Sequence, residues 1–183
     1  MKKVIIAAAV ICAATFVNAA SVGWSNMGLA SYNGDKYLMF VTGQNGASSV
    51  STITALLDAG TAVDSYAIGG GAVSGGTANK AFTASGVSLG EGTYTAFMVL
   101  FDAATPVSGT TKYAVLEGGN NGTGYTQTVG ASTASITFVG GNAASMVSAA
   151  TWKTYGSSAA PEPTSAMLML LGVAGLALKR KRA

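Results

Sequence analysis

Residues 93–101 read TYTAFMVLF, and the last five of them are all apolar. Successive side chains of a β-strand point to opposite faces, so a strand of this composition needs cover on both faces. The run KYLMFVT at Lys36–Thr42 is also rich in aromatic residues, and glycine or turn residues bound both runs. We predict two strands here, and we expect the strand at Thr93–Phe101 to be a central one.

Shorter runs predict further strands and the turns between them. Residues 134–138 alternate apolar and polar side chains, which places Ala134, Ile136 and Phe138 toward the core. Asn-Gly pairs accept the positive φ angles of tight turns. The shorter strand candidates are Tyr113–Glu117 and Tyr66–Ile68, and the predicted turns are Asn33–Gly34, Asn45–Gly46 and Asn121–Gly122.

One segment favours a helix. Apolar residues recur at helical spacing between Ser49, a suitable N-cap, and Gly60, a suitable C-cap, although the threonines between them favour a strand. Asn142–Thr151 is a candidate for a second short helix, and Ser157–Ala160 is a candidate linker. The predicted fold is therefore mainly β: an antiparallel β-sandwich-like core with one or two short helices.

The N-terminal residues have the pattern of a secretory signal peptide. Lys2 and Lys3 precede the apolar run Val4–Val17, and small residues follow it. We predict a signal peptide over residues 1–19, with cleavage between Ala19 and Ala20. Signal peptidase and the Sec translocon are then expected partners. The only cysteine, Cys12, lies inside this signal, so the exported chain has no thiol.

The C-terminal residues combine three features in a fixed order. A Pro-Glu-Pro motif is followed by an uncharged, mostly apolar run at Ala166–Leu178 and then by four basic residues. Thirteen residues of helix cover about 20 Å, and a span this short can cross a bilayer by local thinning. Basic residues after such a span favour a cytoplasmic end, which leaves the preceding chain outside. The motif is Pro161, Glu162 and Pro163, and the basic stop is Lys179, Arg180, Lys181 and Arg182.

This tail resembles the PEP-CTERM sorting signal of Gram-negative bacteria. The resemblance implies that exosortase, a membrane-embedded transpeptidase, processes the chain as its substrate. It also implies an inner-membrane intermediate with a transmembrane sorting helix, followed by delivery to the cell envelope, surface or extracellular matrix. The predicted domains are the signal peptide (1–19), an exported core (20–160) and the sorting signal (161–183).

The composition of the predicted core excludes nucleic-acid binding. Between residues 20 and 160 the chain has four lysines, six carboxylates and no arginine, so the basic character of the whole chain comes from its ends. A protein that binds nucleic acid needs a basic surface. The core is also poor in charge and rich in glycine, yet it has enough aromatic and β-branched residues to fold.

Few residues of the core can carry chemistry. The chain has no histidine, which excludes a Ser-His-Asp device and removes the commonest metal ligand. Paired carboxylates could hydrolyse glycosides, and Asn33–Asp35 could contribute to a calcium loop, but solvated surface acids are the more common case. The carboxylate pairs considered are Asp58 with Asp64 and Glu91 with Asp102.

Two other features, the glycine runs and the aromatic rings, were considered as possible binding sites. Gly69–Gly71 and Gly75–Gly76 lack the strand–turn–helix context of a phosphate loop and are predicted to be a flexible connection. Aromatic rings outside the main strands could stack on sugars, or they could cap the ends of the sandwich, which is the commoner role. These rings belong to Trp24, Trp152, Tyr32, Tyr125 and Tyr155.

We predict a cell-surface or extracellular-matrix structural protein, sorted by exosortase and associated with exopolysaccharide or biofilm. Extracellular polysaccharide is then an expected partner, whereas no enzymatic activity, cofactor or metal is expected. The alternative is an extracellular module that binds carbohydrate or protein, and a less favoured alternative is an exported glycoside hydrolase.

Overall fold

The computed structural model describes residues 20–80, 88–117 and 125–157. The predicted signal peptide at residues 1–19, the turn at Asn121–Gly122 and the sorting signal at residues 161–183 lie outside the described residues. The same holds for most of the predicted linker, residues 158–160.

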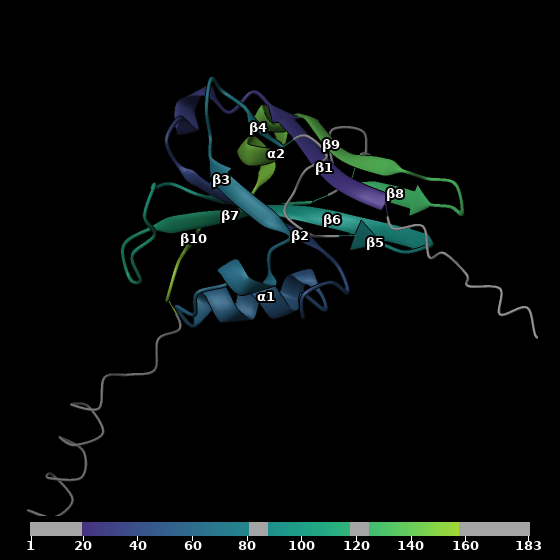
Figure 1. Cartoon of the computed structure of the whole chain (residues 1–183). Helices are drawn as coiled ribbons and strands as arrows, with labels where there is room; N and C mark the ends of the chain where they lie inside the picture. The colour runs from purple at the N-terminus through teal and green to yellow at the C-terminus, as the bar shows by residue number, and fades with distance from the viewer. Residues whose placement is uncertain (1–19, 81–87, 118–124, 158–183) are drawn as a thin grey trace, which may run out of the picture.

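The described residues form two β-sheets and two α-helices, so the core is mainly β as predicted (Figure 1). The larger sheet has the order β10 (Lys153–Thr154), β7 (Lys112–Glu117), β6 (Gly92–Phe101), β2 (Lys36–Val41), β3 (Gly69–Ala72), and β8 (Thr126–Val129) pairs with β6. In the smaller sheet, β1 (Ala20–Met27) pairs with β4 (Ala78–Lys80), β5 (Ser88–Leu89) and β9 (Ser135–Asn142). The helices are α1 (Val50–Asp58) and α2 (Ala143–Ala149), with 3-10 turns η1 (Ala30–Tyr32) and η2 (Asp64–Tyr66).

Strand β6 is central and covered on both faces, which confirms the prediction for residues 93–101. Its side chains alternate between two hydrophobic clusters: Met98 and Leu100 face the smaller sheet, whereas Phe97 and Val99 face α1. Figure 1 shows the resulting layers, with the smaller sheet on one side of the larger sheet and α1 on the other. On the α1 face, Phe97 stacks on Phe40 with ring centroids 5.0 Å apart.

Helix α1 confirms the helix predicted between Ser49 and Gly60. The Ser49 hydroxyl accepts a hydrogen bond from the Thr52 amide, which satisfies a free N–H of the first turn. Gly60 has φ of +73°, and its N–H donates to the Leu57 carbonyl while the Thr61 N–H donates to the Leu56 carbonyl. These two bonds form a Schellman C-cap.

Helix α2 confirms the second helix candidate. The side chain of Asn142 caps its first turn by accepting a hydrogen bond from the Ala144 amide. Val147 of this helix is buried against the core between the two sheets.

Strand β1 was not predicted, and it changes the topology. Its sequence ASVGWSNM has little of the aromatic and β-branched density that marks a strand. It pairs with β9 in parallel, from Ser21 opposite Ser135 to Met27 opposite Asn142. The prediction of a purely antiparallel sandwich is therefore wrong for this pair, whose direction is set by residues more than 100 positions apart.

Two smaller predictions also need correction. Ile136 and Phe138 are buried as expected, but Ala134 is exposed because it precedes β9 and contributes only its carbonyl, which accepts from Ser21 N at 3.0 Å. The strand predicted at Tyr66–Ile68 is wrong: residues 64–66 form η2, and the strand begins only at Gly69.

The glycine run Gly69–Gly71 is part of β3 and not a flexible connection. A Cβ on Gly69 would lie 2.5 Å from Cη2 of Trp24, and a Cβ on Gly70 would lie 2.4 Å from the Tyr37 carbonyl oxygen. Glycine is thus required here by the close approach of β1 and β2 side chains and backbone. Gly75 and Gly76, which were also predicted to be part of a flexible connection, form a turn with positive φ angles.

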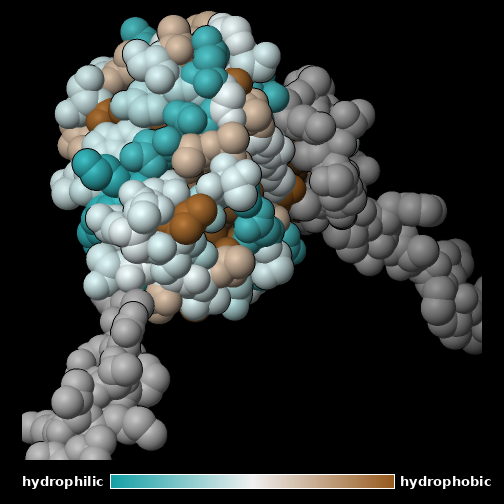
Figure 2. All heavy atoms as spheres, turned by 90° about the vertical axis from the view of Figure 1, so that its left-hand side faces the viewer, coloured by the Kyte–Doolittle hydropathy of each residue, from teal (hydrophilic) through white to brown (hydrophobic). Residues whose placement is uncertain are grey.

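The described surface has few large apolar residues. Met27, Val107 and Val139 are the large hydrophobic side chains exposed in the described part of the chain. Figure 2 shows one side of the molecule, where hydrophobic residues are interrupted by hydrophilic and neutral ones. Among the described residues, the helices are too short and too polar to span a membrane.

Candidate functional site

The predicted sorting residues Pro161, Glu162 and Pro163 and the basic stop Lys179–Arg182 lie outside the described residues. Of the two residues that flank the predicted signal cleavage, Ala20 is described. It is the first residue of β1, is fully buried and pairs with Leu89 of β5. Cleavage between Ala19 and Ala20 stays a prediction.

The carboxylate pair Asp58 and Asp64 makes separate structural contacts. Asp58, at the end of α1, accepts a hydrogen bond from the Tyr113 hydroxyl at 2.5 Å and lies 3.4 Å from the Lys153 ammonium. Burial raises the pKa of Tyr113, and the Asp58 carboxylate raises it further. Asp64 forms an ion pair with Lys36. Each carboxylate therefore has a local partner of its own.

The second pair, Glu91 and Asp102, is too widely separated for a common site. The two residues flank opposite ends of the ten-residue strand β6, so an extended chain places them roughly 35 Å apart. Asp102 instead accepts a hydrogen bond from the Lys112 amide at 2.6 Å. It also lies near Asp35, whose pKa is raised by burial and by the Asp102 charge.

The Asn33–Asp35 turn has a structural role in the described chain. The Asn33 side-chain oxygen accepts a hydrogen bond from the Gly76 amide at 2.8 Å and so joins two turns. Within residues 20–80, 88–117 and 125–157, no three acidic side chains come together to form a metal site.

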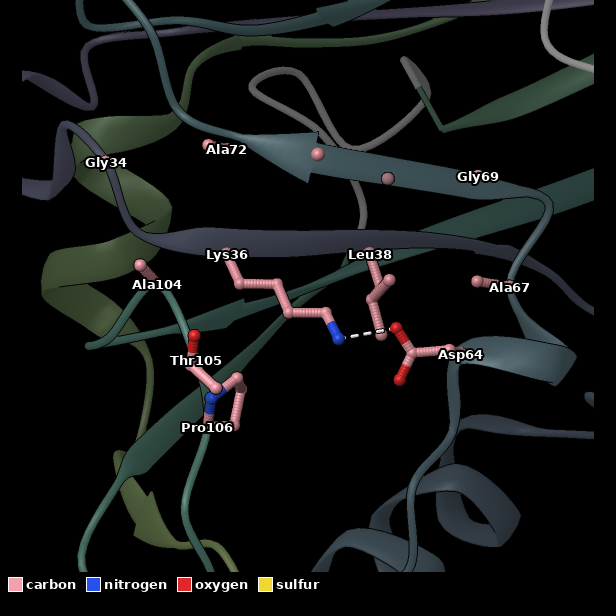
Figure 3. Close-up of a pocket in the computed structure, with 12 residues that line it drawn as sticks. Gly34, Lys36, Leu38, Asp64, Ala67, Gly69, Ala72, Ala104, Thr105 and Pro106 are labelled. Atoms are coloured by element: carbon pink, nitrogen blue, oxygen red, sulfur yellow. Dashed lines mark hydrogen bonds and ion pairs between the residues drawn. The ribbon is translucent and has the colours of Figure 1, made fainter.

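A groove of about 570 Å³ runs beside the edge strand β3 (Figure 3). Its wall along β3 consists of glycine backbone, because Gly69, Gly70 and Gly71 have no side chains to fill it. Lys36 and Asp64 point toward one another across it, and Thr105 and Pro106 line the neighbouring loop. Its two charged groups neutralise each other and no aromatic ring lines it, so the groove offers little to orient a ligand.

Three of the five candidate aromatic rings belong to the core. Trp24 and Tyr125 are buried between the sheets, and Tyr155 is buried on the α1 side. Each finds a polar partner: the Trp24 indole N–H donates to the Tyr37 hydroxyl at 3.2 Å, and the Tyr155 hydroxyl donates to the Gly60 carbonyl at 2.8 Å. The Tyr125 hydroxyl donates to the Asn26 side chain. For these rings, the packing interpretation is correct.

The other two rings, Tyr32 and Trp152, meet at the surface. They stack with centroids 5.5 Å apart and an angle of 16° between their planes. Together with Asp102 and Lys112 they line a hollow of about 290 Å³. Sequence reasoning named both rings but missed Lys112, because nothing in the local sequence places the start of β7 beside residues 32 and 152.

One segment of the chain matches a known family model. Residues 159–182 match the family model of the PEP-CTERM protein-sorting motif. No curated protein and no solved structure matches the chain. The motif implies an exported protein of the cell envelope or surface, with exosortase as its processing partner. The chain therefore carries a PEP-CTERM protein-sorting motif, which covers residues 159–182 and not the folded core.

Proposed function

We propose that this protein is a non-catalytic component of the bacterial cell surface or extracellular matrix, held there in association with exopolysaccharide. The observation that carries the proposal is the sorting motif at residues 159–182, joined in one chain to a folded, mainly β core. The motif implies export, and a charge-poor sandwich suits a stable component outside the cell.

The contacts of the acidic residues support a structural role for the core. Asp58 holds the end of α1 to β7 and β10 through Tyr113 and Lys153. Asp64 holds η2 to β2 through Lys36, and Asp102 fixes the start of β7. A general acid or base needs a carboxyl group that is free to exchange protons with a substrate. Each of these three groups instead has a contact that joins two elements of the fold.

In this proposal the C-terminal residues are consumed by sorting. Proline has a restricted φ angle and also restricts the residue before it, so we expect Pro161 and Pro163 to favour an extended motif for the enzyme. The apolar run Ala166–Leu178 holds the chain in the membrane beside exosortase, and the basic residues Lys179–Arg182 keep the end in the cytoplasm.

The test is the intact mass of the exported protein, produced in a Gram-negative host with and without exosortase. The host with exosortase is expected to release a chain trimmed near Pro161. A Pro161→Ala, Glu162→Ala, Pro163→Ala variant is expected to stay full-length in the membrane fraction. A Thr164→Ala, Ser165→Ala variant is the matched control and should be trimmed like the native chain.

Fractionation then tests the association with exopolysaccharide. The trimmed protein should co-purify with the polysaccharide fraction and leave it when the polysaccharide is digested. Two results contradict the proposal: a native chain that keeps its tail in both hosts, in which case the segment is only an anchor, or a trimmed chain found free in the medium.

A further inference from the structure

The hollow lined by Tyr32, Trp152, Asp102 and Lys112 has the features of a ligand site, and we propose that it binds a neutral hexopyranose unit of an extracellular polysaccharide. This inference rests on the proposed function, since it names the contact through which the protein would be held in the matrix. We call these four residues the ring hollow.

The aromatic rings supply the apolar part of the site. A pyranose ring has a face of C–H groups, which packs flat on an aromatic ring. Tyr32 and Trp152 stack on one another at 16°, so the ring area that a sugar can pack on is the partly exposed area outside the stack. Rings that keep exposed area at a mainly polar surface are a usual element of recognition sites.

The polar groups of the ring hollow are available to sugar hydroxyls. Within the described part of the chain, the Tyr32 hydroxyl and the Trp152 indole N–H make no hydrogen bond, and the Lys112 ammonium makes no ion pair. Asp102 accepts a hydrogen bond from the Lys112 amide through Oδ1, so its second oxygen can accept another. Hydroxyl groups donate and accept at once, so they can use donors and acceptors of both kinds.

Charge and size select the class of sugar. Lys112 and Asp102 contribute one positive and one negative charge, and Asp35 lies near Asp102. The hollow therefore has no net positive charge to favour an acidic sugar. Its volume of about 290 Å³ is near the lower end of ligand pockets, which suits a single sugar ring of a longer chain.

Backbone hydrogen bonds and strand pairing fix the main chain at or near the four residues. Lys112 opens β7 and pairs with Thr154 of β10, two residues after Trp152. The Asp102 amide donates to the Lys112 carbonyl at 3.0 Å, and the Tyr32 amide donates to the Leu29 carbonyl at 2.9 Å. A site fixed in this way loses little conformational entropy on binding. The groove beside β3 lacks such groups, because its lysine is already paired with Asp64.

The chain contains two tryptophans, and this makes the site measurable. Trp24 is buried in the core with 2% of its surface exposed, whereas Trp152 lines the ring hollow. The full-length protein is titrated with cellohexaose, mannohexaose, chitohexaose and hexagalacturonate, and its tryptophan emission is followed. We expect at least one of the three neutral oligosaccharides to change the emission of Trp152, and hexagalacturonate to bind more weakly than that sugar.

Calorimetry on variants assigns the binding to the ring hollow. Tyr32→Ala and Trp152→Ala are expected to weaken binding about tenfold, and Lys112→Gln about threefold. Tyr94→Ala is the matched control, a partly buried ring on β6 that lies roughly 25 Å along the strand from Asp102. It should bind like the native protein. Asp102→Asn keeps the acceptor for the Lys112 amide, so it tests the charge without disturbing the fold.

Several outcomes overturn the proposal. They are the absence of binding to all four oligosaccharides, tightest binding to hexagalacturonate, and equal weakening by Tyr94→Ala and by the ring variants. If the two ring variants fail to fold, the test rests on Lys112→Gln and Asp102→Asn. Native saccharide affinity in both of these variants then contradicts binding in the ring hollow. The intact mass of the same proteins is measured separately, so loss of saccharide binding with normal trimming rejects the ring hollow and leaves exosortase sorting in place.

Discussion

The amide group of Asn26 is a polar contact buried deep between the two sheets. Asn26 is fully buried, its side-chain NH₂ donates to the Ala78 carbonyl at 3.3 Å, and its side-chain oxygen accepts from the Tyr125 hydroxyl. A Cβ on Gly140 would lie 1.9 Å from that oxygen, so this glycine leaves the room in which the amide sits. Burial also raises the pKa of Tyr125, which keeps its hydroxyl a donor.

Removing the Tyr125 hydroxyl should destabilise the protein. Tyr125→Phe leaves the Asn26 oxygen buried without its tyrosine donor, and the expected loss is about 1–3 kcal/mol of unfolding free energy. Asn26→Ala should cost at least as much, because it leaves the tyrosine hydroxyl and the Ala78 carbonyl without this partner. The double variant should cost less than the sum of the two.

Urea denaturation measures the unfolding free energy of the two single variants and of the double variant. Tyr94→Phe is the control, since its hydroxyl bond to the Gly90 carbonyl is only partly buried, and its effect should stay within about 0.5 kcal/mol. Equal losses of unfolding free energy for Tyr94→Phe and Tyr125→Phe would contradict the larger contribution assigned to the buried hydrogen bond between Tyr125 and Asn26.

Residues of this kind could not be predicted from the sequence. Asn26 follows a tryptophan and a serine in a segment with no strand signal, and its partners Ala78 and Tyr125 are about 50 and 100 positions away. The aromatic residues were identified as candidates, yet the division between core and surface rings depends on contacts that only the folded chain defines.

At the scale of elements, α1 and β3 show what local sequence determines. The start and end of α1 depend on hydrogen bonds within a few residues of Ser49 and Gly60, so both ends were predicted. The glycines of β3 favour a loop by propensity, but Trp24 and β2 require them in a strand. Tertiary contacts override propensity in this case.

The two ends of the glycine run should respond differently to alanine. Gly69→Ala places a Cβ 2.5 Å from Trp24, which forces a shift of the core and should cost about 1–3 kcal/mol. Gly71→Ala meets nothing closer than 3.7 Å, the Tyr37 ring. It should be neutral or stabilising, because alanine reduces the conformational entropy of the unfolded chain.

Thermal unfolding followed by circular dichroism compares this matched pair. A Gly71→Ala variant that is less stable than Gly69→Ala would contradict the role given to Trp24. The emission of Trp24 provides a second readout, since it should change in the Gly69→Ala variant alone.

At the scale of the whole molecule, β6 joins two hydrophobic clusters into one cooperative unit. It contributes Met98 and Leu100 to the cluster between the sheets, and Phe97 and Val99 to the cluster under α1. We expect Val22→Ala, in the first cluster, and Leu57→Ala, in the second, each to lower the stability of the entire protein. Typical losses are about 1–3 kcal/mol for Val22→Ala and 2–5 kcal/mol for Leu57→Ala.

Coincident transitions test this cooperativity. Trp24 emission reports on the sandwich and far-ultraviolet circular dichroism reports on the helices and sheets, and in both variants the two signals should give one midpoint. The two losses should also add, because the residues lie on opposite faces of the larger sheet. If α1 of the Leu57→Ala variant unfolds in a separate, earlier transition, the two clusters do not form one cooperative unit.

The sorting motif could be predicted from the sequence because all its residues are contiguous. The family match at residues 159–182 confirms it. The ring hollow was not predictable as a unit, because η1, the residue after β6, the start of β7 and the segment before β10 each contribute one side chain.

The parallel pairing of β1 with β9 has a consequence for secretion. A chain that crosses a membrane from its N-terminal end delivers β1 first, but most of the hydrogen-bonding partners of β1 arrive only with residues 135–142. Closing so long a loop is entropically costly and slow. For an exported chain we therefore expect the smaller sheet to close only after residues 135–142 have crossed the membrane. We expect the docking of β9 to complete the fold on the far side and so to oppose backward movement of the chain.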